Sequence, residues 1–160
     1  MPIHIVLVEP EIPQNTGNII RTCACTGASL HLIRPLGFSL SEKHLKRAGL
    51  DYADLVDIRS YASFAELYFH PDHRGRRKHF YFFTTKAQKN HTEVCYEEEA
   101  YLVFGPESRG LPEEIPSLER RNNLRIPMKD LEKVRSLNLA NSVAVAVYEW
   151  LRQHPQNFFR

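Results

Sequence analysis

The sequence predicts an α/β fold with a largely parallel sheet, and three observations support this prediction. Short runs of β-branched and aromatic residues alternate with segments of helical periodicity along the 160 residues. The runs at 80–85 and 100–105 are apolar on both faces, as buried parallel strands are. Neither an internal repeat nor a long linker divides the chain, so we expect a single domain over residues 1–160.

The first half of the chain alternates three strands with three helices. In order, these are strand 3–8, helix 15–26, strand 30–33, a short basic helix 41–49, strand 55–59 and helix 61–69. The first helix places Ile19 and Ile20 on one face and ends at Gly27, a residue that accepts the left-handed backbone beyond a helix. Ser41 is the expected N-cap of the basic helix, and Gly49 ends it.

The second half adds a polar loop at 70–78, strands at 80–85, 100–105 and 124–128, and a final helix at 137–153. Residues 143–147 alternate large and small side chains, which also suits a strand, but helical flanks extend this segment to about sixteen residues. A helix that is apolar nearly all round must be covered on more than one side. The cover is either the chain's own sheet or, as we favour, a second subunit.

Composition narrows the class of protein. A hydrophobic share of 42% and a charged share of 25% exclude a disordered or collagen-like chain. The net charge of +2 neither demands nor excludes a nucleic-acid partner, and three cysteines cannot form a complete disulfide framework. The chain has no apolar run of membrane-spanning length and no signal-like start, so we expect a cytoplasmic protein.

Several kinds of active site are excluded by missing motifs. The sequence has no G-x-G, no G-K-[ST] and no G-x-S-x-G, which removes the dinucleotide fingerprint, the P-loop and the hydrolase elbow. Cys23 and Cys25 point to different sides of a helix, and His70 and His73 have no partner at zinc spacing. We therefore expect no metal site.

Three polar loops follow predicted strands at the edge where open α/β sheets bind ligands. They are 13–18, which leads to Arg21; 104–112, which holds two Gly and two Pro; and 125–128 with the turn 135–138. The first loop suits a phosphate at a helix N-terminus, although Arg21 could be an ordinary surface residue. Similarly, Glu107 could simply pair with Arg109, and Ser136 could simply cap the last helix.

At these loops the sequence closely resembles the SPOUT superfamily, and within it the small TrmL-type tRNA 2′-O-methyltransferases. The matching segments are EPEIPQNTGNIIR at 9–21, RAGLDY at 47–52, FGPESRGLP at 104–112, RIPM at 125–128 and RSLNL at 135–139. They run the length of the chain. The sequence departs from the family pattern at Ala140, where a small hydroxyl residue is common, and in a longer loop at 129–134.

The resemblance implies a SPOUT fold with a deep C-terminal trefoil knot, an obligate homodimer that uses the first and last helices, and S-adenosylmethionine as cofactor. It places cofactor contacts on Phe83, Gly105, Ile126 and Ser136. It implies methylation of a ribose 2′-hydroxyl of tRNA, most favourably the wobble nucleotide of leucine tRNAs, a cytidine or a modified uridine. S-adenosylhomocysteine would be the product.

The resemblance also assigns the polar machinery. The catalytic set falls on Asn15, Arg21, Glu107, Ser136 and Asn138, with Asn15 and Glu107 holding Arg21. Because an arginine is a poor free base, we expect Arg21 to work together with an RNA phosphate. We expect RNA contacts at Lys46, Arg47, Arg109, Arg135 and Tyr148. Lys46 and Arg47 belong to a basic patch on the predicted 41–49 helix, and a second basic cluster lies at 74–78, although either patch could be an ordinary solvated face. Tyr148 matches a family aromatic and could equally have a plain interface role.

Two rival functions remain open at the sequence level. One is a SPOUT enzyme that acts on ribosomal RNA, another tRNA ribose or a base atom. The other is an RNA-binding module without catalytic activity, which would not bind the cofactor.

Overall fold

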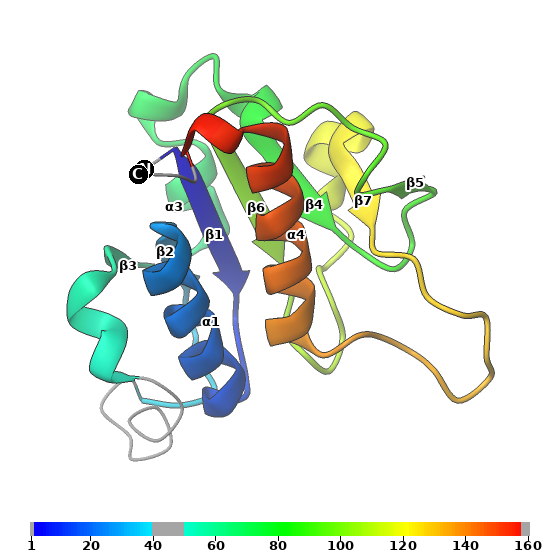
Figure 1. Ribbon diagram of the computed structural model, residues 1–160, viewed down its shortest axis with the longest axis horizontal. Helices are drawn as coiled ribbons and strands as arrows, with labels where there is room; N and C mark the ends of the chain where they lie inside the picture. The colour runs from blue at the N-terminus through cyan, green and yellow to red at the C-terminus, as the bar shows by residue number, and fades with distance from the viewer. Residues whose placement is uncertain (1, 40–49, 158–160) are drawn as a thin grey trace.

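The computed structural model describes residues 2–39 and 50–157. Within them, seven strands form one sheet in the order β3-β2-β1-β6-β4-β7-β5, and all the recorded pairings are parallel (Figure 1). The strands are β1 (Ile3–Val8), β2 (Ser29–Ile33), β3 (Ile58–Tyr61), β4 (Phe80–Phe83), β5 (Lys89–Asn90), β6 (Ala100–Phe104) and β7 (Asn123–Arg125). The predicted α/β architecture with a mostly parallel sheet is confirmed.

The two long helices lie side by side on one face of the sheet. They are α1 (Pro13–Thr26) and α4 (Leu139–Gln153) (Figure 1). Alternate strand residues divide between the faces, so Ile3 and Ile5 pack beneath these helices while Val6 packs on the opposite side. That side holds α3 (Phe64–Tyr68). Burial on both faces explains why the central strands read as continuous apolar runs.

Helix α1 agrees with the prediction except at its start. It begins at Pro13 rather than at Asn15, because proline already has a helical φ and lacks the amide that the first turn leaves unpaired. It ends at Gly27, whose φ of 77° is left-handed.

Helix α4 begins later than predicted, and the alternative in which Ser136 caps it is not what the structure shows. The cap is Asn138, whose side-chain oxygen accepts a hydrogen bond from the amide of Asn141 at 3.2 Å. The capping residue must directly precede the first helical residue, which is Leu139. Ser136 is therefore outside the helix and available for another role.

Only part of the apolar surface of α4 is exposed. Val143, Ala146 and Val147 are completely buried in the core of the chain itself. Val145 and Tyr148 are 39% and 48% exposed. A second subunit that covers α4 would therefore have to pack against the side that carries Val145 and Tyr148.

The third strand lies further along the chain than predicted. Residues 50–55 form a 3-10 helix, η1 (Leu50–Leu55), and the strand is Ile58–Tyr61 instead of 55–59. Leu55 belongs to η1 and is 74% exposed, whereas Ile58 pairs with Leu30 inside the sheet. The apolar character of Leu55 misled the prediction.

Other boundaries differ modestly. The hydroxyl of Ser63 caps α3 by accepting a hydrogen bond from the amide of Glu66, so the helix is shorter than the predicted 61–69. Strand β7 is shorter than 124–128, and the two-residue strand β5 was missed because Lys89 and Asn90 carry no apolar signal. The 70–78 loop contains η2 (Pro71–His73) and the start of η3 (Arg77–His79), and η4 (Pro116–Asn122) precedes β7. The basic helix predicted at 41–49 lies outside the described residues.

No helix in the described part of the chain is long and apolar enough to span a membrane.

Candidate active site

A cavity of about 390 Å³ opens at the carboxyl ends of β4, β6 and β7. Three segments that follow these strands line it, together with the start of α1. The lining residues are Ile12, Asn15, 83–86, 104–111, Ile126, Met128, 135–139 and Ser142. The second and third predicted loops thus meet at one cavity, and the first contributes Asn15, while Ile12 lies just before it.

Glu107 ties the loop after β6 to the start of α1. Its carboxylate accepts hydrogen bonds from the amides of Glu11 at 2.9 Å and Ile12 at 2.7 Å. It also accepts one from Nδ2 of Asn15 at 3.2 Å. These donors lie at a helix N-terminus, where a negative charge is favourable. Glu107 therefore braces the wall of the cavity.

A second contact runs in the opposite direction between the same two segments. The carboxylate of Glu11 accepts hydrogen bonds from the amide of Ser108 at 2.8 Å and from its hydroxyl at 3.0 Å. These bonds lower the pKa of Glu11 below its ordinary value. Each segment thus supplies a glutamate to backbone amides of the other, and we call this reciprocal pair the Glu11–Glu107 clasp.

Asn15 extends this network to the last helix. Nδ2 of Asn138 donates to Oδ1 of Asn15 at 3.0 Å, while Oδ1 of Asn138 caps α4. A continuous line of hydrogen bonds therefore runs from Glu107 through Asn15 and Asn138 to the N-terminus of α4. It fixes three segments that are distant in sequence around one cavity.

The loop after β6 folds back so closely that one position requires glycine. A Cβ on Gly105 would lie 2.2 Å from the backbone carbon of Gly110 and from the nitrogen of Leu111. Gly110 itself has a φ of +69°. Below this loop the rings of Phe83 and Phe104 stack with centroids 4.6 Å apart, which adds a flat apolar surface.

Most of the predicted site residues in the described part line this cavity. They are Asn15, Phe83, Gly105, Glu107, Arg109, Ile126, Arg135, Ser136 and Asn138. Lys46 and Arg47 lie outside the described residues. Tyr148 lies on α4, beyond the residues that line the cavity.

Arg21 does not line this cavity. It projects from the exposed side of α1, and its guanidinium carbon lies 5.1 Å from the centroid of the Tyr52 ring. Asn15 and Glu107 were expected to hold Arg21, but in this structure they hydrogen-bond to each other.

The basic residues differ in how they are paired. Arg109 contacts Glu9, with Nη2 and Oε1 3.4 Å apart, so the alternative in which it simply pairs with Glu107 is not what the structure shows.

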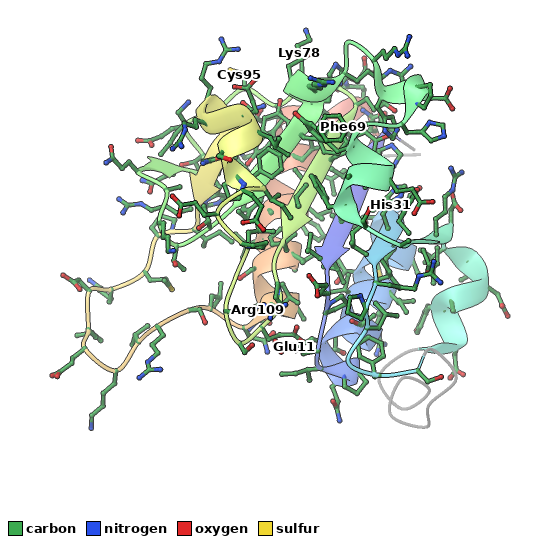
Figure 2. All side chains as sticks on the ribbon, turned by 180° about the vertical axis from the view of Figure 1, so that it is seen from behind. Glu11, His31, Phe69, Lys78, Cys95 and Arg109 are labelled. Atoms are coloured by element: carbon green, nitrogen blue, oxygen red, sulfur yellow. The ribbon has the colours of Figure 1, made fainter. Side chains whose placement is uncertain are left out.

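In the 74–78 cluster, Arg76 pairs with Glu99 and Lys78 with Glu97, both at 3.1 Å. This cluster precedes β4, and Lys78 lies at the opposite end of the molecule from Arg109 and Glu11 (Figure 2).

Sequence reasoning missed two structural features. The contribution of Glu11 and Ser108 was not assigned, although both lie inside the matching segments. It also missed Thr84, Thr85 and Lys86, which line the cavity directly after β4. The predicted strand 80–85 included Thr84 and Thr85, whereas β4 ends at Phe83 and leaves them at its carboxyl end, where ligands bind.

A pair of histidines, His31 buried and His4 half-buried, lies on the α3 side of the sheet. Nδ1 of His4 and Nε2 of His31 are 3.0 Å apart, and Nδ1 of His31 lies 2.8 Å from the hydroxyl of Tyr61. Burial lowers the pKa of both histidines to about 4. No group of three or more metal-ligating side chains gathers here or elsewhere among residues 2–39 and 50–157.

Comparison with known proteins connects this geometry to a family. The profile described as the SpoU rRNA Methylase family matches residues 2–148. A tRNA (cytidine(34)-2'-O)-methyltransferase of Methylovorus glucosotrophus is 48% identical over 155 residues, which is 94% of each chain.

Solved structures show the same similarity. One, described as "Structural insights into the 2-OH methylation of C/U34 on tRNA", is 50% identical, covers 98% of this chain and 99% of its own, and superposes with a TM-score of 0.86. The SpoU methyltransferase AviRb from Streptomyces viridochromogenes, in complex with AdoMet, is only 20% identical, covers 96% of this chain and 58% of its own, and shares the fold with a TM-score of 0.81. With a profile match over nearly its whole length and a close relative of equal extent, this chain belongs to the SpoU methylase family.

Proposed function

We propose that this protein transfers a methyl group from S-adenosylmethionine to the ribose 2′-hydroxyl of nucleotide 34 of tRNA. The observation that carries the proposal is the cavity closed by Glu107, Asn15 and Asn138 in a chain 48% identical to a tRNA (cytidine(34)-2'-O)-methyltransferase over 94% of both lengths. A 50% identical structure described as concerning C/U34 on tRNA supports the same nucleotide. Leucine tRNAs are the proposed substrates.

The cavity fits the proposed cofactor. Its volume of about 390 Å³ lies within the range of about 300–1,000 Å³ that is usual for small-molecule sites. Phe83 and Ile126 offer apolar surface to an adenine ring, and the Gly105 loop offers main-chain groups close to it. Ser136, which does not cap the helix, is free to contact the ribose or the methionine group. When bound, the cofactor supplies an electrophilic methyl group on a sulfonium.

The chain's own residues then have to aim and activate the hydroxyl. We assign Glu107 and Asn15 to holding the cavity wall, because Glu107 is used within the clasp and Asn15 hydrogen-bonds to Glu107 and Asn138. Arg21 binds the phosphate of the target nucleotide, which fixes the ribose and stabilises negative charge as it develops on the 2′-oxygen. Asn138 and Ser136 contact the junction between cofactor and ribose, and Arg109 and Arg135 contact RNA at the cavity rim.

The assembly is proposed to be a cytoplasmic homodimer of single-domain SPOUT chains over residues 1–160, each with a C-terminal trefoil knot. Support for the dimer comes from Val145 and Tyr148, which are exposed on α4, a helix that packs against α1. Arg21 does not line the cavity of its own chain, so the geometry of the single chain does not by itself bring Arg21 to the reacting atoms.

The decisive experiment is methylation of a leucine tRNA transcript by the purified protein, with nucleoside mass spectrometry to locate the product. We expect one 2′-O-methyl group at nucleotide 34 and none on a transcript with a 2′-deoxy nucleotide there. Methylation of ribosomal RNA in place of tRNA, or of a base atom, would overturn the substrate assignment. Cofactor binding without transfer to any RNA would overturn the enzymatic assignment.

A further inference from the structure

The interaction between Arg21 and Tyr52 has no part in the roles assigned so far. The guanidinium carbon of Arg21 lies 5.1 Å from the centroid of the Tyr52 ring. Tyr52 belongs to η1, which packs against α1, and its side chain is half-buried against the main apolar core. The ring is therefore a fixed surface rather than a mobile one.

An aromatic partner affects an arginine differently from a carboxylate. A carboxylate takes up N–H donors in the plane of the guanidinium, whereas a ring below the plane leaves all five donors accessible. Five other arginines have carboxylate partners: Arg59 with Asp57, Arg76 with Glu99, Arg109 with Glu9, Arg121 with Glu119 and Arg152 with Glu149. Within the described residues no carboxylate forms an ion pair with Arg21, so its donors remain available to an anion.

We infer that Tyr52 is a positioning residue for methyl transfer, whose ring holds the guanidinium of Arg21 with its N–H donors directed at an RNA phosphate. The inference rests on the proposed function. A free arginine side chain on a helix surface samples many rotamers, and each productive encounter would have to select one of them. Contact with a ring that packs against the core removes much of that search before RNA binds.

The test compares variants that keep or remove the ring. Tyr52→Phe keeps the aromatic face, while Tyr52→Leu and Tyr52→Met replace it with aliphatic side chains of different length. The readouts are the single-turnover methylation rate at saturating tRNA and cofactor, the KM for tRNA, the cofactor Kd by calorimetry and the melting temperature. Two non-aromatic variants are used so that one poorly folded protein does not decide the result.

We expect both non-aromatic variants to lower the single-turnover rate about tenfold, the scale of a partly desolvated cation–π contact. Tyr52→Phe should stay within about twofold of the parent, and cofactor Kd should not change in any of them. The matched control is Phe69→Leu, because Arg77 lies 5.1 Å from the centroid of the Phe69 ring in the same kind of pair, outside the cavity. Phe69→Leu should leave the rate unchanged.

The background of Arg21→Ala shows whether Tyr52 acts through Arg21. Adding Tyr52→Leu to Arg21→Ala should lower the residual rate no further. A tenfold loss in that background, an equal loss in Tyr52→Phe or Phe69→Leu, or an undiminished rate in both non-aromatic variants would each overturn the inference. These outcomes leave the proposed function intact. A fully active Arg21→Ala variant would instead refute the role of Arg21 itself, and an inactive parent protein would refute the proposed function.

Discussion

Asn138 donates a hydrogen bond to Asn15 across 3.0 Å, although 123 positions of sequence separate the two residues. The same Asn138 side chain caps α4 with its oxygen. One amide therefore joins the start of the last helix to the first turn of the first helix, at the edge of the cavity. Its two roles can be separated because different atoms perform them.

Replacing Asn138 with Asp should keep the cap and remove the donor to Asn15. We expect Asn138→Asp to melt near the parent temperature but to bind the cofactor more weakly. Asn138→Ala loses both roles and should also lose about 1 kcal/mol of stability, or about 2–4 °C in melting temperature. Thermal melts and calorimetry test this, and an Asn138→Asp variant with parental cofactor affinity would show that the Asn15 contact does not shape the cavity.

Glu107→Gln should weaken the clasp. The amides of Glu11 and Ile12 each donate to one carboxylate oxygen of Glu107, and in glutamine one of these oxygens is replaced by an NH₂ group, which cannot accept. We therefore expect the free energy of unfolding to fall by about 2 kcal/mol and the cofactor to bind more weakly. Urea unfolding and calorimetry measure the two effects. Glu113→Gln, an exposed position shortly after the same loop, is the control and should change neither. Parental behaviour of Glu107→Gln would contradict a structural role for the clasp.

Arg21→Ala should separate cofactor binding from turnover. Arg21 lies outside the cavity, so we expect the cofactor Kd to stay within severalfold of the parent value. The methylation rate should fall by at least about 100-fold, as for other lost electrostatic stabilisers. Calorimetry measures the cofactor Kd, and a single-turnover assay measures the methylation rate. If Arg21→Ala lost cofactor affinity and methylation rate to the same extent, Arg21 would not be a residue that acts on the RNA.

The His4–His31 pair predicts a specific dependence of stability on pH. In the folded protein the pKa of His4 and of His31 is about 4, against an ordinary value of 6.5. Between these values the unfolded chain binds more protons than the folded one, so the free energy of unfolding falls as the pH drops from about 6.5 to about 4.

Urea unfolding between about pH 7 and about pH 4.5 measures that slope. His31→Gln cannot take up a proton but can still hydrogen-bond to Tyr61, so its stability should depend less steeply on pH than that of the parent. Parallel curves for the two proteins would show that His31 does not titrate on unfolding.

Two neighbouring valines distinguish the proposed dimer interface from the core. Val147 is completely buried in its own chain, and Val147→Glu should therefore unfold the protein whatever its assembly. Val145 is 39% exposed, and Val145→Glu should give a folded chain that sediments as a monomer. Circular dichroism and sedimentation together test this, and a dimeric Val145→Glu protein would exclude this side of α4 as the interface.

The fold was predictable where apolar patterning is strong. Strands β4 and β6 are continuous apolar runs buried on both faces, and β1 is apolar and buried apart from His4. Gly27 ends α1 as its conformational freedom indicates. Prediction failed at short polar elements such as β5, and at Leu55, whose apolar side chain is exposed in η1. Register with a neighbouring strand decided the position of β3, and one sequence read along its length does not reveal register.

The site was predictable as a set of loops but not as a network. Motifs located most of the residues that line the cavity, including Gly105 and Ser136. They did not reveal that Glu107 would bind backbone amides instead of Arg21, because backbone donors have no side-chain signature in a sequence. The choice of Asn138 over Ser136 as the cap likewise depended on where the helix begins.

The Glu11–Glu107 clasp has a consequence for the order of assembly. Its hydrogen bonds span 95 to 97 positions, and the Asn15–Asn138 bond spans 123. Contacts of such long range form only after most of the chain has been ordered, because each must first overcome the entropy of closing a large loop. A nascent chain whose Asn138 has not yet left the ribosome therefore lacks the complete pocket. A ligand held there recognises the finished protein alone, and its binding energy adds to the stability of the whole fold.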